Sequence, residues 1–218
     1  MRKILIFAGP SAVGKTTLAK LIADRTGEFS LARSATTRAP RRDGNDGEYV
    51  YYSKEEFEAI VKNGGMLEYT EYAGELYGTS SEEIDAIIAS GKTPLLILDL
   101  AGVKSVKASD YPSFSVYLYE DPNVLEERLY ERYIGKAPSV EGLERFVLRK
   151  ERNFDELSNI DGVKDRFDLF VRNLELDAAA SGVLDAFNSG ACVDNTAALS
   201  EIAELVAKKL EKLNNNQR

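Results

Sequence analysis

The sequence of 218 residues contains no histidine, no tryptophan and a single cysteine, Cys192. Without histidine there is no imidazole base and no imidazole metal ligand, which excludes Ser-His-Asp and Cys-His catalysis. One cysteine excludes a disulfide within the chain and is typical of a protein in a reducing compartment. No apolar run approaches the roughly 18 residues of a membrane-spanning helix. We therefore expect a cytoplasmic protein without a membrane partner.

A general excess of positive charge is also missing. The formal net charge is −8, with 28 lysines and arginines against 36 aspartates and glutamates. A protein that coats nucleic acid normally carries a basic face, so the charge balance argues against a nucleic-acid partner. The hydrophobic content of 44% and the length suit one α/β domain with a modest insertion.

Apolar runs alternate with capped, amphipathic segments along the chain. Strands are expected at residues 3–8, 29–34, 93–100, 113–120 and 167–173, and a strand pair with a turn at residues 66–79. Helices are expected at residues 15–26, 53–65, 80–91, 121–133, 143–157 and 194–214, with a loop over residues 35–49. Ser53, Asp121 and a Ser80–Glu83 capping box provide helix starts. Strands alternating with helices predict a three-layer α/β fold around a parallel sheet.

Residues 9–17 read GPSAVGKTT and lie between the first expected strand and the first expected helix. Gly9, Gly14, Lys15 and Thr16 fit the phosphate-loop pattern G-x-x-x-x-G-K-[ST]. Glycines allow successive backbone N–H groups to converge on phosphate oxygens, and the following helix adds its positive dipole end. Lys15 is expected to reach the β- and γ-phosphates and Thr16 to bind Mg²⁺. A glycine turn without function is the alternative, but the strand–loop–helix context favours a nucleotide site.

Asp99 follows a buried strand, at the edge of the sheet where ligands bind in such folds. One interpretation is a Walker-B-like carboxylate that supports Mg²⁺ through water, and the other is a plain helix cap. The stretch DLAG from Asp99 to Gly102 also fits the D-x-x-G of GTPases. That family needs an Asn-Lys-x-Asp motif to recognise its base, and this chain contains none. A GTPase is therefore a weak alternative.

Four further motifs follow the phosphate loop in order. They are SATTRAPR (residues 34–41), EYVYYS (48–53), MLEYTEYAGELYGTS (66–80) and LDLAGVKSVKA (98–108). Together with the loop they closely resemble guanylate kinases, with few gaps from residue 3 to about residue 133 and in patches to Asn173. The resemblance implies a P-loop kinase fold with a small GMP-binding insertion and a helical lid. It implies Mg²⁺-dependent transfer of a phosphoryl group from ATP to GMP or dGMP.

The resemblance also implies which residues bind the acceptor. The residues that match the binders of the GMP phosphate are Arg38, Arg41, Tyr49 and Tyr77, and those that match the guanine readers are Ser34, Glu68 and Thr79. Two guanidinium groups and two phenols suit a phosphate dianion. A carboxylate at position 68 suits the N1–H and N2–H₂ donors of guanine, a pair that adenine lacks. Asp99 belongs to this acceptor set as well as to the metal site.

On the ATP side the resemblance implies a lid with mobile arginines. The helix LEERLYER supplies Arg128 and Arg132, and a third arginine is Arg149 if the lid carries three inserted residues, or Arg145 otherwise; we favour Arg149. The ATP site would comprise Gly9, Pro10, Ser11, Ala12, Val13, Gly14, Lys15, Thr16, Thr17 and Asn173, which matches an asparagine near the adenine. The expected division is a core of residues 1–33, 80–121 and 165–218, an acceptor region of 34–79 and a lid of 122–164.

Three departures from the family pattern keep other functions open. Ile97 replaces the first aspartate of a D-x-D strand, YERYIGKAPS replaces a glycine-rich lid, and the C-terminal region is longer than usual. That region is either a dimer surface or a longer closing helix, so a monomer or a homodimer is expected. The alternatives are a kinase for an altered or modified guanine nucleotide and a non-catalytic module that binds phosphopeptides. The second is disfavoured because such modules usually degrade the phosphate loop, and Lys15 and Thr16 are both present.

Overall fold

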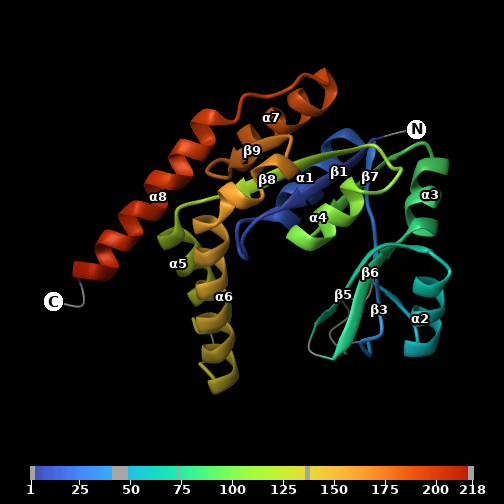
Figure 1. The fold of residues 1–218 in the computed structure, drawn as a ribbon, viewed down its shortest axis with the longest axis horizontal. Coiled ribbons are helices and arrows are strands. Elements are labelled where there is room, and N and C mark those ends of the chain that lie inside the picture. Colours follow the sequence, from blue (N-terminus) through green and yellow to red (C-terminus); the bar gives the residue numbers. More distant parts are fainter. Residues whose placement is uncertain (1–2, 41–48, 73, 136–137, 216–218) are drawn as a thin grey trace. The chain divides into compact units, whose positions relative to one another are not determined.

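A computed structural model describes residues 3–40, 49–72, 74–135 and 138–215 (Figure 1). The strands are β1 Ile4–Ala8, β2 Phe29–Leu31, β3 Ser34–Thr36, β4 Tyr49–Tyr51, β5 Met66–Tyr72, β6 Glu75–Ser80, β7 Thr93–Ile97, β8 Ser113–Tyr119 and β9 Leu169–Arg172. The α-helices are α1 Lys15–Thr26, α2 Lys54–Lys62, α3 Ser81–Ala89, α4 Leu100–Lys107, α5 Pro122–Tyr133, α6 Val140–Ser158, α7 Leu176–Ser189 and α8 Thr196–Asn215. Two 3₁₀ turns, Ile160–Gly162 and Lys164–Arg166, precede β9.

The central sheet has the strand order β2-β7-β1-β8-β9. The pairs β2–β7 and β8–β9 are parallel. Every residue of β1 is fully buried, as are most residues of β7 and β8. Strands covered on both faces read as continuous apolar runs, which is why these strands were predictable. The α/β fold with a parallel central sheet is confirmed.

The chain divides into two compact units. The first comprises residues 1–6 and 19–114, and the second comprises residues 7–18 and 115–218. We call them the acceptor unit and the loop unit, after the motifs that each contains, and describe each by itself.

The acceptor unit contains a second sheet with the order β4-β3-β6-β5. Strands β5 and β6 form an antiparallel pair, as predicted for residues 66–79. The prediction of a continuous loop over residues 35–49 is wrong at both ends, because β3 pairs with β4 and with β6. Three-residue strands are too short to show an alternating pattern, so only their partners reveal them.

Helix starts in the acceptor unit agree with the sequence in part. Ser53 forms the full reciprocal capping box with Glu56 at the start of α2. Ser80 caps α3 by accepting from the Glu83 N–H, but the expected return bond from Glu83 is replaced by another contact. The Glu83 carboxylate instead accepts from the backbone N–H and the guanidinium of Arg33, at 2.8–3.2 Å. A charged partner offers a stronger hydrogen bond than a backbone amide, and this holds the end of β2 to α3.

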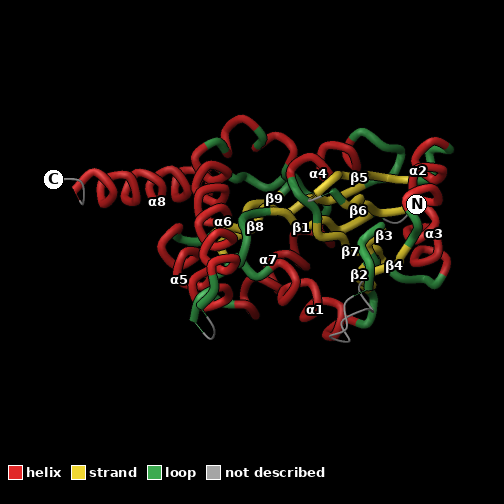
Figure 2. Tube along the Cα trace, turned by 90° about the horizontal axis from the view of Figure 1, so that it is seen from below, coloured by secondary structure: helices red, strands yellow, loops and turns green. Residues whose placement is uncertain are grey.

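The loop unit contains the helix pair α5 and α6, which lie side by side in Figures 1 and 2 and are in direct contact. Asp121 caps α5 and Pro122 begins it, as predicted. Helix α6 begins at Val140, three residues before the expected start, because Ser139 caps it by accepting from the Gly142 N–H.

The C-terminal helix α8 belongs to the same unit. It contacts the edge strand β9 and also α5 and α6, with Ile202 and Leu205 buried. The helix therefore packs on the edge of the sheet and on two other helices. Its last turns extend beyond α5 and α6 and are exposed (Figure 2). Helix α7 was not identified from the sequence.

Candidate functional site

The phosphate loop of the loop unit has a backbone that demands glycine at two positions. Gly9 has φ +133°, and a Cβ atom there would lie 2.1 Å from the carbonyl oxygen of Leu118. Gly14 has φ +101°, and a Cβ atom there would lie 2.4 Å from Nδ2 of Asn173. Ala12 also has a positive φ, +66°, and is the only non-glycine residue with one in the described part of the chain. This is the backbone geometry that a phosphate-binding loop requires.

Lys15 lies inside the loop and donates to two of its carbonyls. Its Nζ is 2.7 Å from the oxygen of Gly9 and 2.9 Å from that of Pro10. The pKa of Lys15 is lowered to about 8, mainly by burial and in addition by the neighbouring guanidinium groups of Arg149 and Arg132, while Glu156 opposes them. A cation with so much of its hydration removed is suited to bind an anion that enters the loop.

Three arginines of α5 and α6 lie at this loop. Arg149 Nη1 donates to Ser11 Oγ at 3.0 Å, and Arg128 Nη1 donates to the Ala12 carbonyl at 3.4 Å. Arg132 lines the same cavity of about 440 Å³. The other residues around this cavity include Ser11, Ala12, Gly14, Lys15, Thr16 and Thr17. The alternative lid residue Arg145 instead pairs with Glu141 at 2.6 Å on an exposed face of α6.

Two buried asparagines form hydrogen bonds to backbone groups of the phosphate loop. Asn173, which follows β9, is 6% exposed and donates from Nδ2 to the Val13 carbonyl at 2.7 Å. Asn153 of α6 is 5% exposed and bonds both backbone groups of Ser11. Asn153 could not be selected from the sequence, since it belongs to no motif and its partner lies 142 positions earlier in the chain.

In the acceptor unit, Glu68 and Thr79 form one buried pair. They face each other in the β5–β6 register, and Thr79 Oγ1 donates to Glu68 Oε1 at 2.8 Å. A bulge between Met66 and Glu68 turns both Leu67 and Glu68 to buried positions, against the usual alternation of a strand. Burial raises the pKa of Glu68, the hydrogen bond from Thr79 opposes this, and the nearby charge of Asp99 raises it further.

The space beside this carboxylate depends on a glycine that the sequence analysis did not select. A Cβ atom at Gly102 would lie 3.3 Å from Glu68 Oε2 and 3.4 Å from Asp99 Oδ1. Asp99 itself caps α4 by accepting from the Gly102 N–H at 2.7 Å. The structure therefore shows Asp99 acting as a helix cap, and its carboxylate also lies next to Glu68, the residue expected to recognise guanine. Ile97, two residues earlier at the end of β7, is partly exposed.

A second cluster of the acceptor unit joins three residues expected to bind the GMP phosphate. The guanidinium carbon of Arg38 lies 5.2 Å from the ring centroid of Tyr49, and the rings of Tyr49 and Tyr77 are 6.5 Å apart. Ser34 is opposite Tyr49 in the β3–β4 register. Arg41, the fourth expected phosphate ligand, lies outside the described residues. Strand pairing therefore brings together residues that lie far apart in the chain, since Thr36 and Tyr77 are partners in the β3–β6 register.

In the part of the chain that the structure describes, no group of three or more carboxylate or cysteine side chains gathers in a metal-binding arrangement. Nor does any helix of these residues have the length and apolar character needed to cross a bilayer.

The comparisons with known proteins agree with this geometry. The family model described as guanylate kinase matches residues 1–189. A guanylate kinase of Synechococcus sp. (strain CC9311) is 36% identical over 79% of this chain and 90% of its own length, and that of Trichormus variabilis is 35% identical over 83% and 87%. The solved guanylate kinase of Anaplasma phagocytophilum is 22% identical, with a TM-score of 0.57 over 87% of this chain and 88% of its own, and supports the fold. The chain belongs to the guanylate kinase family.

Proposed function

We propose that the protein transfers the γ-phosphoryl group of ATP to GMP or dGMP, forming ADP and GDP or dGDP. The observation that carries the choice of acceptor is the buried Glu68, whose carboxylate is oriented by Thr79. A carboxylate accepts from N1–H and N2–H₂ of guanine together, whereas adenine offers no such pair of donors. Ser34 and Asp99 complete the guanine side, and Arg38, Arg41, Tyr49 and Tyr77 bind the acceptor phosphate.

The reaction needs charge neutralisation more than proton transfer. An oxygen of the GMP phosphate attacks the γ-phosphorus, and the bond to the β–γ bridging oxygen breaks, so the electron pair leaves with ADP. The acceptor oxygen is already anionic, so no general base is required, which fits a chain without histidine. Lys15, Arg128, Arg132 and Arg149 stabilise the charge that develops on the transferring group.

Mg²⁺ is the proposed cofactor, and the residues fit it in a limited way. Magnesium retains several waters and binds through few protein ligands together with substrate phosphates, which agrees with the absence of a carboxylate cluster in the described residues. Thr16 lines the loop cavity and its hydroxyl would contact the ion, and Asp99 would act through water. When bound with ATP, the ion would neutralise charge on the phosphates.

Other elements of the proposal rest on the family. Asn173 lies near the adenine, residues 34–79 form the acceptor region, residues 122–164 the lid and the remaining segments the core. We propose a cytoplasmic monomer or homodimer whose partners are nucleotides and not nucleic acids or membranes.

An assay of ADP release with Mg·ATP and a panel of GMP, dGMP, AMP, CMP and UMP tests the function. Turnover confined to GMP and dGMP is expected. Turnover with another acceptor would favour a kinase for an altered acceptor. The specific reason to consider that alternative is that Ile97 replaces a carboxylate of the family pattern. ATP binding without turnover of any of these acceptors would contradict the proposed transfer to GMP or dGMP and favour either an altered acceptor outside the panel or a binding module.

A further inference from the structure

Asn153 makes a two-way hydrogen-bonded contact with one residue of the phosphate loop. Its Oδ1 accepts from the Ser11 N–H at 2.7 Å, and its Nδ2 donates to the Ser11 carbonyl at 2.9 Å. A side-chain amide that binds both backbone groups of one residue fixes the orientation of the peptide planes on either side of it. Because Asn153 is only 5% exposed, water has little access to compete for these bonds.

The same face of α6 also holds the side chain of Ser11. Arg149 lies four residues before Asn153 and therefore on the same side of the helix. Its guanidinium donates to Ser11 Oγ at 3.0 Å. Helix α6 thus forms hydrogen bonds to both the backbone and the side chain of Ser11. A change in one of these contacts displaces the other.

The backbone conformation of Ala12, the residue after Ser11, explains why these contacts are needed. Ala12 has φ +66°, a left-handed conformation that costs a residue with a Cβ atom about 1–2 kcal/mol. Such conformations persist only where the surroundings over-determine them. The fixed peptide at Ser11 supplies that constraint on the N-terminal side of Ala12.

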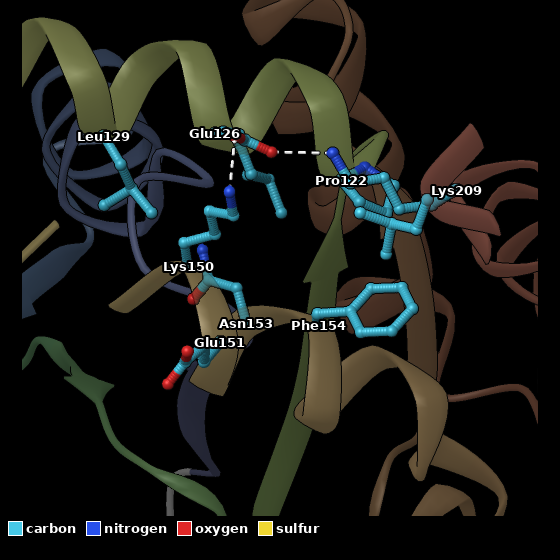
Figure 3. A pocket seen from close by; sticks show the side chains of 10 residues that line it. Pro122, Glu126, Leu129, Lys150, Glu151, Asn153, Phe154 and Lys209 are labelled. Carbon is cyan, nitrogen blue, oxygen red and sulfur yellow. Dashed lines mark hydrogen bonds and ion pairs between the residues drawn. The ribbon is translucent and has the colours of Figure 1, made fainter. Parts of the chain in front are cut away.

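The position of α6 at this point is itself fixed. Figure 3 shows Asn153 beside Lys150 at a small apolar cavity of about 130 Å³, lined mainly by α5, α6 and α8. Lys150 pairs with Glu126 of α5 at 2.8 Å, and Lys209 of α8 pairs with the same carboxylate at 2.6 Å. Asn153 therefore lies on a part of α6 that ion pairs connect to α5 and α8, and not at a free end of the helix.

We propose that Asn153 is a positioning residue for ATP: it holds Ser11 and Ala12 in the conformation that receives the phosphates, and it aligns Arg149 with them. This inference rests on the proposed function, because it assumes that the loop binds ATP. It assigns Asn153 no contact with the nucleotide.

Steady-state kinetics of Asn153→Leu, a near-isosteric change without hydrogen-bonding groups, test the proposal. Losing both bonds should raise KM for ATP about tenfold or more and leave KM for GMP within about twofold. Asn159→Leu is the matched control, since Asn159 is the C-cap residue of the same helix, is exposed, and donates to the Asp155 carbonyl. The control should keep both KM values. Asn153→Asp, which keeps one acceptor oxygen and loses the donor, is the second variant if the leucine does not fold.

The outcomes separate the two proposals. An unchanged KM for ATP in a folded variant would overturn the positioning role while the kinase function stands. An equal rise in KM for ATP and for GMP would show that Asn153 has a general structural role, and it would also overturn the positioning role. Absence of ATP turnover by the unsubstituted protein would refute the kinase function itself.

Discussion

In the phosphate loop, Lys15 is partly exposed and its ammonium donates to the Gly9 and Pro10 carbonyls, whereas in the acceptor unit Arg38, which is also partly exposed, lies over the ring of Tyr49. The loop cations face a backbone that comes from one short stretch of sequence. The acceptor residues are assembled from the four strands of the second sheet and a helix start. One site is therefore a property of a local backbone, and the other is a property of strand register.

This difference has an energetic consequence. Lys15 is desolvated, as its lowered pKa of about 8 shows, so its charge acts in a medium of low dielectric constant and contributes strongly to phosphate binding. On the acceptor side the desolvated group is the carboxylate Glu68, and the cation Arg38 is partly hydrated. We expect removal of the loop cation Lys15 to lower turnover strongly and single substitutions in the acceptor unit to change the affinity for one substrate.

The largest effect is expected for Lys15→Met. Removing the buried cation should lower kcat at least about 100-fold, because a preorganised charge next to the transferring group is lost. The melting temperature without nucleotide should stay the same or rise, since a desolvated charge disappears. Coupled ADP release and a thermal melt with and without Mg·ATP measure both, and Lys62→Met on the exposed end of α2 is the control. Retention of activity would refute the loop assignment.

Glu68→Gln is the acceptor counterpart. It should raise KM for GMP about 10- to 100-fold, because a charge-assisted pair of hydrogen bonds to guanine is replaced by an amide with one mismatched donor, and KM for ATP should not change. Glu71→Gln, on the exposed part of the same strand β5, is the matched control and should retain both values. Equal changes for the two substrates would contradict the guanine role and remove the contrast between the two units.

The pH dependence should distinguish the units further. With a pKa of about 8, Lys15 loses its proton as the pH rises, so kcat/KM for ATP should fall about tenfold between pH 7 and pH 9. The folded pKa lies below the ordinary value of 10.5, so between pH 8 and 10.5 the unfolded chain binds more protons and this group increases stability as the pH rises. The Lys15→Arg variant should have a low kcat/KM for ATP that does not change over the same pH range. A flat profile in the unsubstituted protein would contradict the buried-cation description.

The smallest effect is expected for Ala12→Gly. Glycine removes the strain at φ +66° but increases the conformational freedom of the unfolded chain. The free energy of unfolding, measured by denaturant titration, should therefore change by no more than about 1 kcal/mol. Combined with Asn153→Leu it should recover part of the ATP affinity, because glycine tolerates the left-handed conformation without being held there. A double variant as weak as Asn153→Leu alone would show that Asn153 does not act through Ala12.

Much of the fold was predictable because its elements carry local signals. Apolar runs marked β1, β7 and β8, and capping residues such as Ser53 and Asp121 marked helix starts within a residue or two. The errors have a common cause, since β3 and β4 are too short to show a period, and Glu83 is drawn to Arg33 by a contact 50 positions away. Local patterns do not register such long-range partners.

By itself, the sequence determined the phosphate loop, because Gly9, Gly14 and Lys15 are needed by a backbone that forms within nine consecutive residues. It also determined the acceptor chemistry through the motifs that resemble the family. Only the tertiary structure decided that Asn153 and Arg149 meet Ser11, that a bulge turns Glu68 inward against Thr79, and that Gly102 leaves space beside it. These contacts depend on how a helix face and a strand register come together, and no short segment contains that information.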